Sequence, residues 1–396
     1  MAQKLRTRSQ LLYRDAFLCL CMSLVFMFAL SFLVVNLSIF DPFTKAFKDF
    51  NFLDLYYSEN MATLKPTNEI VLVNVEHADR FQIQELLSHI QNQNPKVIGL
   101  DIIFKQKKDP FVDSLLQIQL NRPNVIAAKA FVNDSWNYDF SNSEKNLKKT
   151  GYTNLNFNST ENVIREFQGQ KSINDTVHVS LATAIVSYYY GNDWPTKKIQ
   201  EKLENESTIN FVGNLDSFIN FSVEECLTTQ TIPAMNGKIV LLGYLGTPHA
   251  SNTDIEDKFF TPLNSVSAGK SAPDMFGAVI HANIIQMMLT DTYFTKVPNW
   301  IITICALLLA YFGLVFFLWY NLKYPASYGI VLKIAQLTLT ILLLWFSLWL
   351  YKNKIIFAPE LVTVFLVISV EFIDLFELIT EKLNTKYKWK SFYFYD

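Results

Sequence analysis

The chain has 396 residues, of which 50% are hydrophobic and only 18% are charged. The mean hydropathy of +0.16 is too low for a chain that lies entirely in a membrane, and it fits a mixture of spans and a sizeable polar domain. The net charge of −2 gives no overall basic footprint for nucleic acid, and four cysteines cannot form a disulfide scaffold at this length.

The N-terminal segment predicts a cytoplasmic tail followed by a membrane anchor. Residues 1–15 are rich in Lys and Arg, whereas residues 16–40 contain no charged side chain. A run of this length can cross a hydrocarbon core of roughly 30 Å as a helix. We interpret it as an uncleaved anchor, because it is longer than the apolar part of a signal peptide and no small-residue cleavage site follows it.

Residues 41–296 predict an extracytoplasmic domain. They carry 22 basic and 29 acidic residues, a net charge of −7, and lie between basic tails. Cys226 is the only cysteine among them. Because a single cysteine cannot form an intramolecular disulfide, we expect a hydrophobic core to hold this domain together, and its length is sufficient for one.

The first half of this domain alternates between strand-like and helix-like stretches. Residues 69–75, 96–104 and 124–131 are apolar and rich in β-branched side chains, and residues 79–93 and 113–120 have apolar side chains at helical spacing. Strands that are apolar throughout are typical of a parallel sheet covered on both faces. The sequence therefore predicts an α/β fold with a mainly parallel sheet.

The second half of the domain is more polar. Residues 133–150 predict a loop. The remaining predicted elements are a hairpin of 151–157 with 163–167, helices over 177–190 and 276–289, and strands over 208–212 and 238–243.

Three further spans are predicted at 297–322, 330–351 and 355–376, followed by a tail over 377–396. The last of them contains Glu360, Glu371 and Asp374, so its uninterrupted apolar stretch is the shortest. Both terminal tails are rich in basic residues, which favours a cytoplasmic location for each. The sequence thus predicts four transmembrane helices with both termini in the cytoplasm.

Several short motifs follow one another through the domain in a particular order. They are Asp101 with Phe104, Gly151 with Asn154 and Arg165, the stretch 237–243, Asp257 with Thr261 and Pro262, and Gly277 with His281 and Ala282. Followed by three closely spaced spans, this order resembles the second type of CHASE domain, the extracellular sensory module of bacterial cyclases and histidine kinases. The resemblance covers roughly residues 50–375.

This resemblance implies a bacterial inner-membrane protein with a periplasmic sensory-type domain. Members of the family usually carry a cytoplasmic output domain, whereas about 20 residues follow the last predicted span here. We therefore expect any output to be produced by a separate partner protein.

The sequence shows no motif of nucleophilic, zinc-dependent or nucleotide-dependent catalysis. It lacks Gly-x-Ser-x-Gly, His-Glu-x-x-His and Gly-x-x-x-x-Gly-Lys-Ser/Thr. We therefore expect no enzymatic activity, no catalytic residues, no cofactor and no bound metal.

Candidate ligand-binding residues follow two of the predicted strands. Glu76 and His77 come after strand 69–75, and Asp101 comes after the apolar run 97–100. Ligands of open α/β sheets bind at the carboxyl ends of the strands, so these residues could contact a small molecule. Helix capping or loop stabilisation is the alternative interpretation.

Two further candidates are Asp257 and His281. His281 lies in an apolar helical stretch, and the loop that contains Asp257 precedes it by about 20 residues. A structural hydrogen bond between them is one interpretation. The other is a ligand-dependent or pH-dependent switch, because histidine titrates near neutrality.

The last helix has an acidic face formed by Glu371, Asp374, Glu377 and Glu381. Docking to a partner helix and packing within the membrane are the two interpretations of this face.

Two functions remain open from the sequence. The protein either binds a periplasmic ligand or protein and acts through a partner, or it is a scaffold subunit of a cell-envelope complex. In both cases we expect contact with membrane lipid and with protein partners, which could include further copies of this chain, and no contact with nucleic acid.

Overall fold

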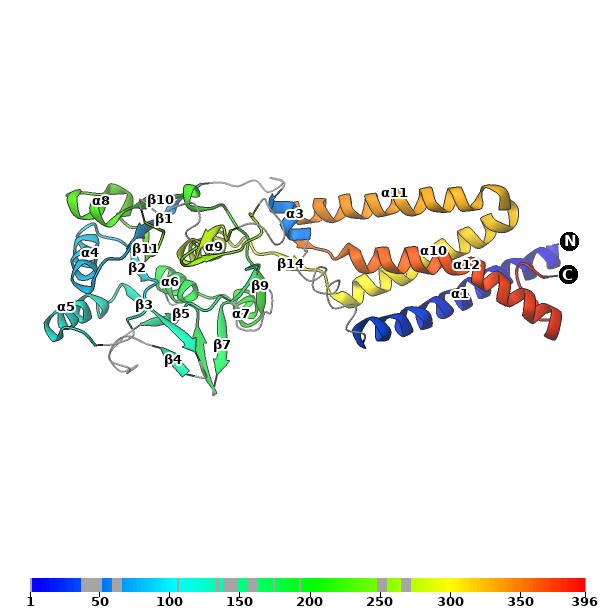
Figure 1. The fold of residues 1–396 in the computed structure, drawn as a ribbon, viewed down its shortest axis with the longest axis horizontal. Coiled ribbons are helices and arrows are strands. Elements are labelled where there is room, and N and C mark those ends of the chain that lie inside the picture. Colours follow the sequence, from blue (N-terminus) through cyan, green and yellow to red (C-terminus); the bar gives the residue numbers. More distant parts are fainter. Residues whose placement is uncertain are drawn as a thin grey trace. The chain divides into compact units, whose positions relative to one another are not determined.

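The computed structural model describes residues 2–36, 52–58, 66–104, 107–132, 135–137, 149–155, 163–173, 175–191, 194–247, 255–264 and 272–395. The chain divides into two compact units (Figure 1). A helical unit consists of residues 1–47 and 295–396, and an α/β unit consists of residues 48–294.

The α/β unit is built on a sheet that has seven strands among the described residues. Its strands are β1 (Thr67–Asn74), β2 (Val97–Leu100), β3 (Val125–Val132), β4 (Ser135–Asn137), β5 (Thr150–Tyr152), β10 (Phe218–Phe221) and β11 (Ile239–Gly243). They are ordered β10-β1-β11-β2-β3, and both β5 and β4 pair with β3. All of these pairs are parallel except β3 with β4, which confirms the predicted mainly parallel α/β fold.

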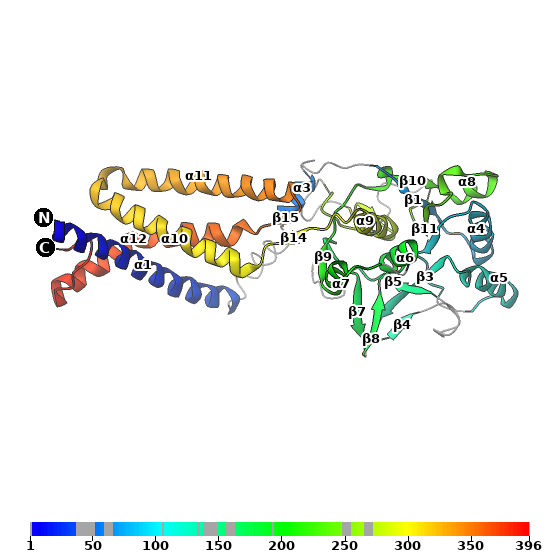
Figure 2. The ribbon, with the colours of Figure 1, turned by 180° about the vertical axis from the view of Figure 1, so that it is seen from behind.

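Helices cover both faces of this sheet (Figures 1 and 2). On one face, α4 (Arg80–Asn92), α5 (Pro110–Leu120) and α8 (Val223–Thr228) contribute to a single hydrophobic core with the strands. On the other face lie α6 (Leu181–Tyr190) and α9 (Gly277–Thr290), which also contact each other. Because both faces are covered, every residue of β11 is buried.

Local sequence explains where several of these helices begin. Asp79 and Gln82 form a reciprocal capping box at the start of α4, and Ser222 and Glu225 do the same for α8. Asp109 caps α5 and is followed by a proline at the first helical position, which needs no amide donor there. Each helix therefore begins at a residue that its own sequence specifies.

The smaller elements lie at the edges of the sheet and in the connections. They are α3 (Phe52–Ser58), β6 (Glu166–Gln168), β7 (Gln170–Ile173), β8 (Thr176–Val179), α7 (Lys197–Glu204), β9 (Glu206–Thr208), β12 (Lys258–Phe259) and β13 (Met275–Phe276), with two 3-10 turns at Leu215–Ser217 and Pro233–Met235.

Some predicted elements in the polar half were wrong. The hairpin of 151–157 with 163–167 does not form, because β5 pairs with β3 and β6 pairs with β9. The helix predicted over 177–190 begins only at Leu181, since the preceding residues form β8. Most of the loop predicted over 133–150 lies outside the described residues.

The helical unit contains α1 (Ala2–Asn36), α10 (Asn299–Lys323), α11 (Pro325–Lys352) and α12 (Pro359–Tyr387), together with the short strand pair β14 (Thr295–Lys296) and β15 (Ile355–Ile356). Among the described residues, three helical stretches are long and apolar enough to cross a membrane: Arg8–Phe32, Asn299–Lys323 and Pro325–Lys352. The protein is therefore membrane-embedded. Helix α12 is not among these three, because acidic side chains interrupt its apolar run.

Small residues on α10 face α12. Ala306 and Ala310 are fully buried, and a Cβ placed on Gly313 would lie 3.7 Å from Leu366 and 3.9 Å from Val370. Small side chains allow helix backbones to approach each other closely in a membrane. On its other side α12 reaches α1, where the hydroxyl groups of Ser23 and Ser369 are hydrogen-bonded at 3.2 Å.

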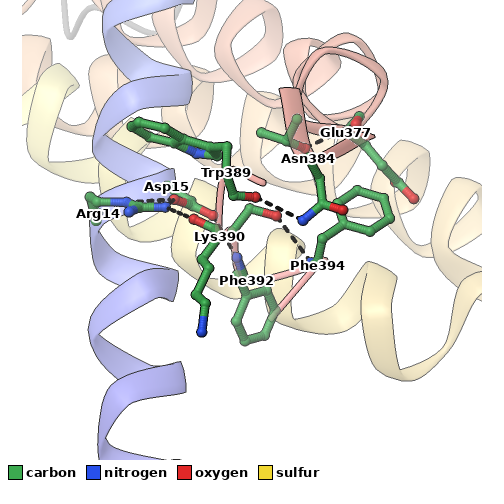
Figure 3. Close-up of polar contacts among 10 residues, drawn as sticks. Arg14, Asp15, Glu377, Asn384, Trp389, Lys390, Phe392 and Phe394 are labelled. Atoms are coloured by element: carbon green, nitrogen blue, oxygen red, sulfur yellow. Dashed lines mark hydrogen bonds and ion pairs between the residues drawn. The ribbon is translucent and has the colours of Figure 1, made fainter. Parts of the chain in front are cut away.

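The residues after α12 fold back onto α1 (Figure 3). The amide of Phe392 donates a hydrogen bond of 2.6 Å to the carboxylate of Asp15, and Arg14 Nη2 donates one of 2.5 Å to the carbonyl oxygen of Lys390. Arg14 also pairs with Asp15 at 2.7 Å and lies over the ring of Trp389. We call these contacts the tail clamp.

A buried ion pair joins α4 to α5 in the α/β unit. Arg80 Nη1 lies 2.6 Å from Asp113 Oδ1, and both side chains are less than 10% exposed. Burial alone would raise the pKa of Asp113, but the amide of Lys108 and the Arg80 guanidinium outweigh it and lower this pKa. The pair therefore stabilises the fold above the ordinary pKa of an aspartate, and this contribution is lost as the pH falls through the lowered value.

We expect Asp113→Ala to destabilise the α/β unit by about 3–5 kcal/mol, because it removes a carboxylate that compensates the charge of the buried Arg80 guanidinium. For a unit of this size the melting temperature should fall by about 6–20 °C. Thermal unfolding of the full chain in detergent, followed by circular dichroism, measures this change. Glu85→Ala, which removes an exposed carboxylate from α4, is the control and should change the melting temperature little. Equal effects of the two substitutions would contradict the prediction.

Candidate functional site

Asn74 organises the loops at the carboxyl edge of the sheet. Its side-chain oxygen accepts hydrogen bonds from the amides of Glu76 and Leu245, at 3.0 and 2.9 Å, and its amide group donates one of 2.7 Å to Gly246. It thereby joins the loop after β1 to the loop after β11, the neighbouring parallel strand. Among the predicted site residues, Glu76 is therefore held directly by this network.

Asp101 and Asp257 lie near each other where β11 ends and α9 begins. A Cβ placed on Gly243 would lie 3.5 Å from the Cβ of Asp101 and only 2.5 Å from that of Ala278, so glycine is what lets α9 approach the strand end. A Cβ placed on Gly277 would lie 3.4 Å from the carboxylate of Asp257. The structure therefore gathers these two predicted site residues around one helix start.

The electrostatic environment favours the neutral form of both carboxyl groups. Burial raises the pKa of Asp101 from its ordinary 3.8 to about 7. Burial, followed by repulsion from Asp101 and Glu256, raises the pKa of Asp257 to about 7. Asp101 is less exposed to solvent than Asp257, so Asp101 contributes more to the pH dependence of stability.

Glu76 and His77 lie at the same edge in a separate hollow. They line a cavity of about 310 Å³ together with Gln82, Val223 and Thr247. The His77 ring contacts Tyr244, with centroids 5.6 Å apart, and Tyr244 in turn contacts Phe276, which caps α9. This hollow is therefore linked through aromatic contacts to the start of the same helix.

His281 lies one turn along α9 from Gly277 and is almost completely buried. Burial lowers its pKa to about 4, although a hydrogen bond to the Thr153 backbone acts in the opposite direction. Its Nδ1 atom has no hydrogen-bond partner among the described residues. The imidazole is thus neutral at physiological pH. It packs between α9 and the residue after β5, Thr153.

The chemistry of this carboxyl edge suits a cation or a proton. Two carboxyl groups that repel each other are relieved by protonation or by a positively charged ligand group. Among the described residues, no group of three or more His, Cys, Asp or Glu side chains is arranged to hold a metal ion.

A second polar cluster, which the sequence did not indicate, lies at the opposite edge of the unit. Tyr57 of α3 donates a hydrogen bond of 3.1 Å to the side-chain oxygen of Asn210 and accepts one of 3.0 Å from the amide of Phe211. The Asn210 side chain then donates one of 3.0 Å to the hydroxyl of Thr292. We call Tyr57, Asn210 and Thr292 the junction.

The junction joins the two chain segments that lead toward the membrane helices. Helix α3 follows α1 in the chain, and Thr292 precedes α10 by a few residues. A bidentate ion pair further fixes α3, since Arg165 contacts both carboxylate oxygens of Asp54 at 2.9 and 2.7 Å. Asp54 and Tyr57 were missed because residues 52–58 are too few for a periodic helical signal.

Helix α9 connects the carboxyl edge with the junction. Its start contacts Asp257, its middle is fixed by Asn283, which accepts a hydrogen bond from Val212, and its end leads to Thr292. Fourteen residues of helix span about 21 Å, and eleven of the fourteen are buried.

The acidic residues of α12 are partly used inside the helical unit. Glu371 contacts Lys333 and Gln336 of α11, and Glu377 accepts a hydrogen bond of 2.9 Å from Asn321 of α10. Asp374 and Glu381 are exposed. The side chains of the predicted docking face therefore do not share one environment.

Comparison with known families identifies the class of protein. Residues 18–318 match the CHASE2 domain. This match covers more than half of the chain, so the protein belongs to the CHASE2 family of sensory domains, and the resemblance found in the sequence is confirmed. No curated protein and no solved structure matches the chain.

We expect Asp101→Asn to become increasingly stabilising relative to wild type as the pH rises from 5 to 7. A carboxyl group whose folded pKa is raised to about 7 binds its proton more tightly in the folded state, so the wild type loses stability through this window. His281 acts in the opposite direction below pH 6.5, but it does so equally in both proteins.

The measurement is the melting temperature of wild type and Asp101→Asn at pH 5, 6 and 7. Asp216→Asn serves as the control, because this aspartate lies in a 3-10 turn elsewhere on the unit. A difference between wild type and Asp101→Asn that stays constant with pH would contradict the assignment.

Proposed function

We propose that this protein is a non-enzymatic sensor of the bacterial inner membrane that acts through a separate partner. Its CHASE2 domain faces the periplasm and binds a ligand, and the bound state passes through the spans to the partner. The observation that carries this proposal is the path from the carboxyl edge through α9 to the junction, because it ends at both segments that lead toward the membrane helices.

The ligand we propose carries a positive charge. The support is the pair Asp101 and Asp257, whose mutual repulsion a cationic group would relieve, with Glu76 at the same edge of the sheet. A ligand shifts an equilibrium only if it binds the two states with different affinity. Ionised carboxylates in the bound state and neutral ones in the free state provide such a difference.

Four spans with both termini in the cytoplasm complete the proposal. Support for α12 as the fourth span comes from its packing, because Val370, Ile373 and Phe376 are buried in a common core with α1 and α10. The exposed acids Asp374 and Glu381 provide a surface for a partner near the cytoplasmic end of α12.

Reporter fusions test this topology. Green fluorescent protein fused after Tyr395 should fluoresce, and alkaline phosphatase inserted at Asn353, in the turn after α11, should be active. The reason is that basic residues at the N- and C-terminal ends of the chain favour the cytoplasmic side. Active phosphatase at the C-terminus would contradict the four-span arrangement.

Hydrogen exchange of the full chain tests the path from the carboxyl edge of the sheet through α9 to the junction. We expect Asp101→Asn to change amide exchange in residues 290–299 at least two-fold, because α9 connects Asp101 with this segment. Asp216→Asn is the matched control and should leave residues 290–299 unchanged. If the effect of Asp101→Asn stays confined to residues 101–104 and 255–264, the proposed path through α9 is wrong.

A substitution in the junction tests the same path at the end opposite to Asp101. We expect Asp101→Asn to change amide exchange in α3 as well, because the junction joins α3 to the end of α9. Tyr57→Phe keeps the ring but removes the hydroxyl that contacts Asn210 and Phe211, so this effect on α3 should disappear in the double variant. Tyr152→Phe, which also removes a buried hydroxyl, should preserve it.

Affinity purification in mild detergent then identifies the partner, and a partner that binds wild type and Asp101→Asn equally would favour the scaffold function.

A further inference from the structure

The tail clamp brings basic residues from the two ends of the chain to one place. Arg8 lies over the ring of Phe392, 5.4 Å from its centroid. Arg14 lies over the ring of Trp389 at 5.0 Å, and both of these side chains are drawn in Figure 3. The backbone of Lys390 accepts a hydrogen bond from Arg14, so its side chain is not needed for the clamp. Lys388 and Lys390 are exposed next to these rings, and Lys386 precedes them at the end of α12. We call Arg8, Arg14, Lys386, Lys388, Lys390 and Trp389 the clamp surface.

The clamp surface has an excess of positive charge. Among the described residues, Arg14 is the only one of its five cations in an ion pair, and its partner Asp15 is fully buried. A surface of this kind attracts anions, because Asp15 compensates only one of the cations.

The position of the clamp surface indicates which anions are available. Arg8 is the first residue of one candidate span, and Lys323 is the last residue of another. The tail contacts this second span near its end, where Asn321 donates a hydrogen bond of 3.1 Å to the hydroxyl of Tyr393. The ends of spans lie at the level of the lipid headgroups.

The aromatic side chains fit the same place. Tyr387 and Trp389 are 65% and 41% exposed, although they lie at the end of a tightly packed helix bundle. Tyrosine and tryptophan concentrate at membrane interfaces, where one part of the ring is in apolar and the other in polar surroundings. Basic and aromatic side chains together are the composition that binds anionic bilayers.

We propose that the clamp surface binds the phosphate headgroups of anionic phospholipids. The headgroup oxygens contact Arg8, Lys388 and Lys390, and Trp389 lies among the adjoining acyl chains. The partner is the bilayer in which the spans lie, so the binding site is present whenever the protein is in a membrane that contains anionic lipid.

Spin-labelled lipids provide the test. The full chain is placed in phosphatidylcholine vesicles that contain labelled phosphatidylglycerol or labelled phosphatidylcholine, and electron paramagnetic resonance gives their relative association constant. The variant Lys386→Gln/Lys388→Gln/Lys390→Gln should reduce the preference for phosphatidylglycerol at least about five-fold, since a single basic residue near an anionic surface already contributes about five-fold. The clamp should remain intact because it uses the backbone of Lys390, and circular dichroism checks this.

The control variant is Lys296→Gln/Lys352→Gln/Lys354→Gln. It removes three positive charges from the ends of the spans remote from the clamp, and it should keep the preference. Equal loss in both variants, or no loss in either, would overturn the proposal. Loss of the preference in 10 mM inorganic phosphate would also overturn it, because it would identify a site for soluble phosphate instead of lipid.

Discussion

The burial of the parallel sheet on both faces determines where this protein can place polar chemistry. Strands β1, β11 and β2 have almost no exposed side chains, and helices occupy the space above and below them. The two edges where the strands begin and end are then the places that remain open for polar groups. The carboxyl pair lies at one edge and the junction at the other, and α9 is the element that reaches both.

The sequence predicted what depends on local periodicity and missed what depends on long-range pairing. The apolar runs of β1 and β11 identify buried strands wherever they pair, and α4 and α9 show helical spacing over three turns or more. The strand β5 has only three residues, so its partner is decided by the packing of Gly151 against α6 and not by its own pattern. The assumption that neighbouring short strands form hairpins was therefore the error.

The candidate site illustrates the same division. Its residues could be predicted because parallel strands end at a common edge. The distance between Asp101 and the loop of Asp257 could not be predicted from the sequence. Gly243 decides that distance, since the absence of a side chain there lets Ala278 approach the strand. The junction could not be predicted, because Tyr57, Asn210 and Thr292 come from three segments whose proximity results from the completed fold.

The tail clamp also has a consequence for the order in which the helical unit can form. A ribosome makes α1 first, yet the amide that binds Asp15 belongs to Phe392, which is 377 residues later in the chain. Until then Asp15 has only its neighbour Arg14 as a partner, and α1 also lacks α10 and α12, against which it packs. The complete packing of α1 therefore forms only after the C-terminal end of the chain has been made, so assembly of the bundle is a late event in biosynthesis.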